Sequence, residues 1–371
     1  MINWRDGVVV SLGREWDGAL ETTVRTSDGA EVRALAYPGL VGRPAEGDRV
    51  LLNTTALERG LGTGGYALVA ALPDALPVAQ PPGPGHLVKA RYTPLQTMVL
   101  GVDEQESDHH ETLREADSLD SMPVVVADLH SALPAIVAGI HEQAPDARVA
   151  YVMTDGGALP AWFSRTVAQM RDEGLIVSCL TVGQAFGGDL EAVTVHSGLL
   201  AARHVVGADV TVVAQGPGNL GTGTRWGFSG VAAGEAVNAA ATLGGRPVGS
   251  LRVSASDARP RHVGVSHHST TAYGRVALTA ADVVVPVLDE SVDVPVSLGG
   301  PTGLNALVEE QVAALAARHR LVRRAAGAAL LSALRRSPVR MSSMGRDLAA
   351  DPTPFLAAAA AGEHAAALLR G

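Results

Sequence analysis

The pattern of hydrophobic and polar positions changes near Pro123. Before it, from Gly7 to about Leu72, short apolar runs such as VVVSL and VLLN alternate with turn signals, and Asp28-Gly29 is typical of a hairpin. Four or five short strands at this spacing predict a small barrel or sandwich of the SH3 or OB kind. Such modules bind peptides, nucleic acids or a neighbouring domain, and we expect this one to pack against its neighbour.

After Pro123, nearly continuous apolar runs alternate with stretches of helical periodicity. The apolar runs predict strands at 124–128, 148–153, 175–181, 209–214, 248–253 and 282–288. The other stretches predict helices at about 132–143, 160–173, 190–206, 229–243, 268–280, 303–318, 325–336 and 346–369. Strands buried on both faces lose polar alternation, so the pattern predicts an α/β fold with a mostly parallel, doubly wound, Rossmann-like sheet.

Length and composition divide the chain into regions. Its 371 residues exceed the size of one hydrophobic core, which is about 250–300 residues. The segment at 73–85 is rich in proline and glycine, and 102–122 is acidic and poor in apolar residues. We predict a β domain over 1–75, a linker with an acidic segment over 76–122, an α/β domain over 123–300 and C-terminal helices over 301–371. We expect the C-terminal helices to pack on the sheet or to form the interface of a homo-oligomer.

Charge and composition exclude several classes of protein. The net charge of −9 argues against nucleic-acid binding through a basic face. The N-terminus lacks the basic and apolar regions of a signal peptide, and no run of about 18 apolar residues would span a membrane. The single cysteine, Cys179, lies in an apolar run, and the single lysine, Lys89, is a candidate for chemistry that needs a titratable amine. We expect a soluble, cytoplasmic protein.

Polar residues follow the predicted strands at their carboxyl ends, where ligands bind in open α/β sheets. The candidate acids, bases and metal ligands in these loops are Asp128, His130, Asp155, Asp189, Asp257, His262, His267 and His268. Loops that only reverse the chain need not be this polar, so we expect one functional edge. Helix capping also accounts for Asp189, and a helix start held by Ser266 also accounts for His267 and His268.

A glycine-rich run follows the fourth strand of the α/β region. Gly216, Gly218 and Gly221 match G-x-G-x-x-G, which lets backbone amides approach an oxyanion at a helix N-terminus. The residues expected to bind such an anion are Gly156, Gly157, Gly216, Gly218, Asn219, Gly221, Thr222, Thr224, Arg259 and Arg261. As a dinucleotide fingerprint the run is weak, because it does not follow the first strand and lacks a suitably spaced acid. A plain glycine-rich crossing loop is the alternative.

The same loops contain residues of the types that bind a divalent metal cofactor. His262 and His267 are residues of the type that titrate near neutral pH or ligate a metal. Asp128, His130, Asp155 and Asp189 complete a carboxylate and imidazole site if the loops converge. Adjacent residues of a helix point about 100° apart, so His267 and His268 need help from the loop geometry to face one metal.

Three segments together resemble a family. They are 155–160 (DGGALP), Gly216 to Thr224 and Arg259 to Tyr273. They resemble an uncharacterised bacterial family, the domain of unknown function DUF3866, over nearly the whole chain. The resemblance implies no activity, substrate or catalytic residue.

These observations lead to three hypotheses of function. The first is an enzyme that acts on a small anionic metabolite, phosphorylated or nucleotide-like, at the carboxyl edge of the sheet. The second is a non-catalytic sensor or scaffold whose β domain binds a protein or nucleic-acid partner. The third, an NAD(P)-dependent oxidoreductase, rests on the glycine spacing alone.

Overall fold

A computed structural model describes residues 1–79, 81 and 83–370. The chain divides into two compact units. The β unit comprises Met1–Leu100 and Trp162–Ala168, and the sheet unit comprises Gly101–Ala161 and Gln169–Gly371. The predicted domain boundaries stay predictions. Within the expected linker and acidic segment the structure has three short elements: β6 (Leu87–Lys89), β7 (Thr97–Val99) and α3 (His110–Leu113).

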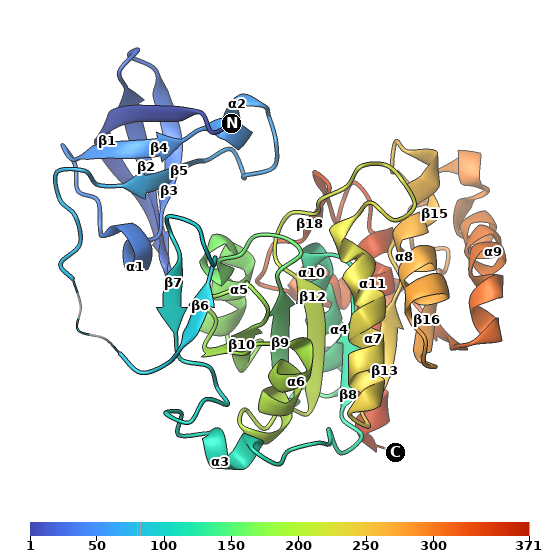
Figure 1. Ribbon diagram of the computed structural model, residues 1–371. Helices are drawn as coiled ribbons and strands as arrows, with labels where there is room; N and C mark the ends of the chain where they lie inside the picture. The colour runs from blue at the N-terminus through green and yellow to red at the C-terminus, as the bar shows by residue number, and fades with distance from the viewer. Residues whose placement is uncertain (80, 82, 371) are drawn as a thin grey trace. The chain divides into compact units, whose positions relative to one another are not determined.

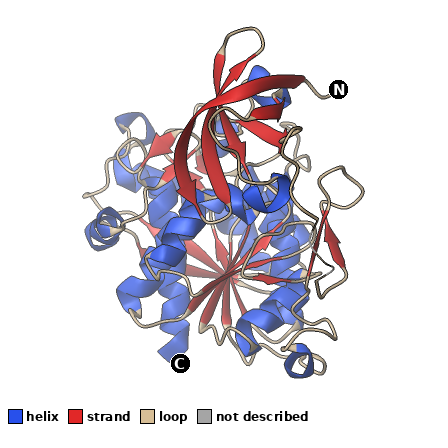
Figure 2. Ribbon diagram, turned by 90° about the vertical axis from the view of Figure 1, so that its left-hand side faces the viewer, coloured by secondary structure: helices blue, strands red, loops and turns tan. Residues whose placement is uncertain are grey.

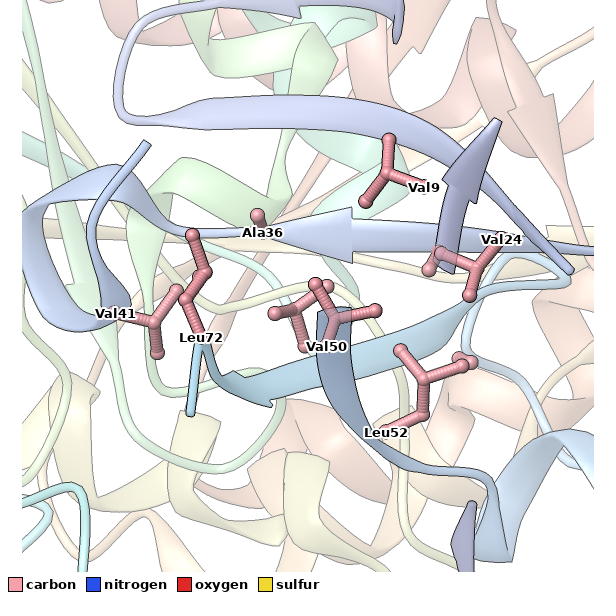
Figure 3. Close-up of a cluster of buried hydrophobic side chains, with 10 residues drawn as sticks. Val9, Val24, Ala36, Val41, Val50, Leu52 and Leu72 are labelled. Carbon is pink, nitrogen blue, oxygen red and sulfur yellow. The ribbon is translucent and has the colours of Figure 1, made fainter. Parts of the chain in front are cut away.

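The β unit contains the small barrel that the N-terminal pattern predicts. Five strands close it in the order β1-β2-β3-β5-β4. They are β1 (Trp4–Trp16), β2 (Ala19–Thr26), β3 (Glu31–Ala36), β4 (Arg49–Asn53) and β5 (Ala67–Ala71), with the short helices α1 (Pro38–Val41) and α2 (Thr55–Glu58). Gly29 has a φ of 86°, which suits the predicted hairpin turn between β2 and β3. Val9, Val24, Val50 and Leu52 fill the barrel interior (Figure 3).

The sheet unit is built on eight strands, all paired in parallel, in the order β11-β10-β9-β12-β8-β13-β16-β17 (Figure 1). Six of them confirm predicted strands: β8 (Pro123–Val126), β9 (Val149–Thr154), β10 (Ser178–Thr181), β12 (Val210–Gln215), β13 (Arg246–Ser250) and β16 (Asp282–Val287). The edge strands β11 (Leu190–Glu191) and β17 (Arg320–Ala325) were not predicted from the sequence. An edge strand needs no continuous apolar run, and three of the six residues of β17 are arginines.

Helices lie on both sides of this sheet (Figure 2). They are α4 (Leu133–Gln143), α5 (Arg165–Asp172), α6 (Val195–His204), α7 (Ala233–Thr242), α8 (His267–Thr271), α9 (Gly300–Val312), α10 (Ala328–Arg336) and α11 (Thr353–Ala367). None of the helices in the described part of the chain combines the length and the apolar character that crossing a membrane requires.

Several predicted helices have wrong limits, and for three of them the structure shows why. The helix expected from residue 190 begins at Val195, because β11 comes first and Thr194 is the N-cap. The one expected from 346 begins at Thr353, after a hairpin of β18 (Ser342–Ser343) and β19 (Arg346–Asp347). The one expected over 268–280 is split into α8 and a π-helical turn at Ala272–Val276.

Candidate functional site

The loops after β8, β9 and β12 meet at the carboxyl edge of the sheet. Gln215, the last residue of β12, donates from Nε2 to the carbonyl oxygen of Asp128, 2.8 Å away. Ala158 N donates to Pro217 O at 2.7 Å. A Cβ on Gly157 would overlap the carbonyl oxygen of Gly216, so glycine is required where these two loops touch. The structure therefore brings the predicted residues of these three loops to one edge.

A side chain of the glycine-rich run contacts the start of the helix that follows it. The Asn219 side-chain oxygen accepts from Gln215 Nε2 at 3.0 Å, from Ser229 Oγ at 3.1 Å and from Gly230 N at 3.3 Å. Ser229–Ala232 is the 3-10 turn that leads into α7. Asn219 thus links the run to the start of the following helix, and the expected anion-binding role of the run stays a prediction.

The second half of the run folds on itself. Thr222 N donates to Gly227 O at 2.7 Å, and Gly227 N donates to Thr224 Oγ1 at 3.1 Å. Gly221 pairs with Phe228 in an isolated antiparallel bridge. These contacts make the predicted hydroxyl donors part of a local turn.

Three histidines converge where the loop after β13 enters α8. One ligand-type atom of each of His262, His267 and His268 lies within 4.8 Å of the others. Ser266 organises them as the N-cap of α8: its Oγ accepts from His268 N at 3.2 Å and lies 2.7 Å from His262 Nδ1. The predicted role of Ser266 at the helix start is confirmed. His267 is the first residue of α8 and directly follows the N-cap. The backbone geometry at this helix start allows the rings of the adjacent His267 and His268 to converge.

Burial keeps two of these rings neutral. Burial, followed by the nearby Arg252 guanidinium, lowers the pKa of His262 to about 3. Burial, followed by the neighbouring His268, lowers the pKa of His267 to about 4. Both imidazoles are therefore uncharged at neutral pH and keep a lone pair for a proton or a metal.

Asp128 lies behind the third ring. Its carboxylate oxygen Oδ2 is 3.5 Å from His268 Nδ1, and both side chains are more than nine-tenths buried. Neither atom has a hydrogen-bond partner among the described residues. Phe228, at the end of the glycine-rich run, stacks on the His268 ring with centroids 3.8 Å apart. The ring is thus held between an aromatic face and a carboxylate.

A second cluster surrounds Asp257. Its carboxylate accepts two hydrogen bonds from the Arg259 guanidinium at 2.9 Å and one from Arg346 at 3.0 Å, with Arg252 3.8 Å away. The hydrogen bond from Arg259 is the main reason that the pKa of Asp257 lies well below its usual range. Asp257 and Arg259 pair with each other, and the expected role of each toward a ligand stays a prediction.

A cavity of about 630 Å³ lies beside the histidines. Three arginines line it: Arg225 from the glycine-rich run, Arg261 from the loop after β13 and Arg275 from the π-helical turn. His267 forms part of the wall. Among the residues that the structure describes, these three guanidinium groups form no ion pair, and no carboxylate lines the cavity. Other residues of its wall come from α8 and α9, which Figure 1 draws in orange.

The family described as a protein of unknown function (DUF3866) matches residues 33–362. The chain belongs to this family. The match runs from β3 into α11 and includes the histidine cluster, the cavity arginines and Asp128. No curated protein matches the chain.

Three further predicted residues of this DUF3866 protein have other contacts. His130 Nδ1 lies 3.1 Å from Tyr151 Oη. The exposed Asp155 accepts from Gln184 N at 2.8 Å. Asp189 accepts from Cys179 N and pairs with Arg171 at 2.6 Å. In the described part of the chain, the group that could hold a metal is the three histidines, without these side chains.

Several residues of the DUF3866 site were missed by the sequence analysis. Arg252 and Gln215 had a usable signal, because each lies at the carboxyl end of a strand, as Asp128 does. Arg275 gave none, since the pattern placed it inside a continuous helix. Arg346 is 89 residues from Asp257 in the sequence, and only the tertiary fold pairs them.

The half-buried His130 should make the stability of the protein depend on pH. Burial lowers the pKa of His130 to about 4, whereas an unfolded histidine has a pKa of about 6.5. Between these values the unfolded chain binds a proton that the folded protein does not bind. The free energy of unfolding should therefore fall by about 1.4 kcal/mol per pH unit as the pH drops through this window.

Urea unfolding between about pH 7 and pH 5 tests this expectation. The free energy of unfolding of His130→Gln should fall less steeply with decreasing pH than that of the wild type. The difference in slope should correspond to one bound proton. Tyr151→Phe is the control, since it removes the hydrogen-bond partner and keeps the titrating ring. Equal slopes for His130→Gln and the wild type would contradict the assignment.

Proposed function

We propose that this DUF3866 protein is an enzyme that acts on a small polyanionic metabolite held in the arginine-lined cavity. The observation that carries the proposal is the convergence of Arg225, Arg261 and Arg275 on one cavity with no acid in its wall. Guanidinium groups bind phosphate and carboxylate through paired hydrogen bonds. A volume of about 630 Å³ falls within the range of small-molecule sites.

The position of the cavity in the fold supports a site for a ligand. We propose that the parallel sheet is of the doubly wound, Rossmann-like class and that the barrel is of the SH3 or OB kind. In the strand order, β8 lies between β12 and β13, with β9 on one side of it and β16 on the other. The chain thus builds outward in both directions from β8, and doubly wound sheets bind ligands at such a switch point.

His267 favours an enzyme over a sensor. Its ring borders the cavity, and its buried Nε2 has no hydrogen-bond partner among the described residues. A neutral imidazole in that place can accept a proton or bind an electrophile beside a held anion. The nicotinamide hypothesis gains no such support and still rests on the glycine spacing alone.

Calorimetric titration with inorganic pyrophosphate tests the anion site. We expect Arg261→Ala and Arg275→Ala each to weaken binding about 10- to 100-fold, the loss of a charge-assisted hydrogen bond. Arg59→Ala, which removes an exposed arginine of the β unit, should leave the affinity unchanged. Equal affinities for all the variants would contradict the proposal.

Turnover is tested separately from binding. The wild type is incubated with phosphorylated and polycarboxylate metabolites, and products are followed by mass spectrometry. His267→Ala should bind pyrophosphate and lose turnover. If binding depends on the arginines while no metabolite is converted, the sensor hypothesis is favoured instead.

A further inference from the structure

The three histidines have the chemistry of a transition-metal site. Three imidazoles that leave a fourth position open are typical of catalytic zinc, whereas Mg²⁺ and Ca²⁺ prefer oxygen ligands. We propose that His262, His267 and His268 bind one divalent ion of the zinc class, with its open position toward the arginine-lined cavity.

The geometry of the rings is compatible with one ion. Ring centroids are 4.4 to 5.0 Å apart, and the ligand-type atoms lie within 4.8 Å of one another. Nitrogens that bind zinc tetrahedrally at about 2.0–2.1 Å lie about 3.4 Å apart. Small side-chain rotations therefore close the site, and His267, the least buried of the three, has the most room to move.

The surrounding contacts orient the rings as metal sites require. Ser266 Oγ lies at Nδ1 of His262, and the Asp128 carboxylate lies near Nδ1 of His268. In both rings Nε2 is left to act as the ligand. A carboxylate behind a ligating histidine fixes its tautomer and raises its basicity.

The unpartnered buried atoms are a second, independent observation. Asp128 Oδ2, His268 Nδ1 and His267 Nε2 are buried without a hydrogen bond among the described residues. Such atoms are costly unless something satisfies them. A cation bound by the His268 ring would strengthen a hydrogen bond from His268 Nδ1 to Asp128 Oδ2. The same cation would be bound directly by His267 Nε2.

Next to a held anion, such an ion would serve hydrolysis, and this part rests on the proposed function. Water would cleave an ester bond: its oxygen bonds to phosphorus or carbon, the bond from that atom to the leaving oxygen breaks, and a proton from water goes to the leaving oxygen. The ion acts as a Lewis acid and makes the attacking water more acidic. His267 belongs to both features, since it lines the cavity and lies in the cluster.

Cobalt binding tests the site without any substrate. The full chain is stripped with a chelator and titrated with Co²⁺, and the visible absorption of tetrahedral cobalt and the metal content are measured. We expect about one ion per chain, displaced by Zn²⁺. His262→Ala and His267→Ala should lose the absorption, whereas His196→Ala, an exposed histidine on α6, should keep it.

Asp128→Asn separates a positioning role from a structural one. It should keep the stoichiometry and lower the cobalt affinity about 10- to 100-fold, with circular dichroism showing the fold retained. A wild-type stoichiometry far below one, or equal binding by the histidine variants and the wild type, would overturn the proposal. Pyrophosphate binding to the stripped protein is measured in parallel, so failure of the metal site is distinguishable from failure of the anion site.

Discussion

Replacing Asp257 with asparagine should lower the free energy of unfolding by about 3–5 kcal/mol, as expected when one partner of a buried ion cluster is removed. The Asp257 side chain is 2% exposed and is the negative centre for Arg252, Arg259 and Arg346. The Arg252 side chain is 8% exposed, so water cannot replace the carboxylate that it would lose. The amide keeps the shape of the carboxylate but leaves the clustered positive charge unbalanced.

Chemical unfolding followed by far-ultraviolet circular dichroism measures this effect. Glu309→Gln is the matched control, because it removes the same charge from an exposed pair with Arg323 in the same unit. Exposed pairs contribute about 0–1 kcal/mol, so the control should barely differ from the wild type. Similar losses for the two variants would mean that the Asp257 cluster is not a buried ion network.

The sheet was predictable because its physical signal is local. Strands such as β8 and β12 are buried on both faces and read as continuous apolar runs. The edge strand β17 is half exposed and lacks that signal. The start of α6 was misplaced because acids near residue 190 resemble a helix cap, whereas Glu191 lies in β11 and Thr194 caps the helix.

The candidate site was predictable only as a set of loops. Topology brings Asp128 and His268 to one edge, which the sequence indicates without saying that they touch. Partner choice is not a local property. Arg259 lies two residues from Asp257 and pairs with it, whereas Arg261, two residues further on, lines the cavity.

Replacing Gly139 with valine should cost about 3 kcal/mol, the upper part of the range for overpacking. Gly139 lies in α4 and Gly362 in α11, where the two helices pack together. A Cβ at Gly139 would overlap the carbonyl oxygen of Ala359, and one at Gly362 would overlap that of Ile136. Backbone atoms cannot rotate away, so the helices have to separate and expose their apolar faces.

Thermal and chemical unfolding of Gly139→Val and four further variants tests this close approach. Ala306→Val, on an exposed position in the middle of α9, measures the cost of valine in a helix itself, which is below about 1 kcal/mol. Gly139→Ala and Gly362→Ala should each destabilise the protein although alanine favours a helix. The double alanine variant should lose less than the sum, because helices forced apart at one glycine already have room at the other. Additive losses, or a gain in stability from either alanine, would show that the helices do not meet through these glycines.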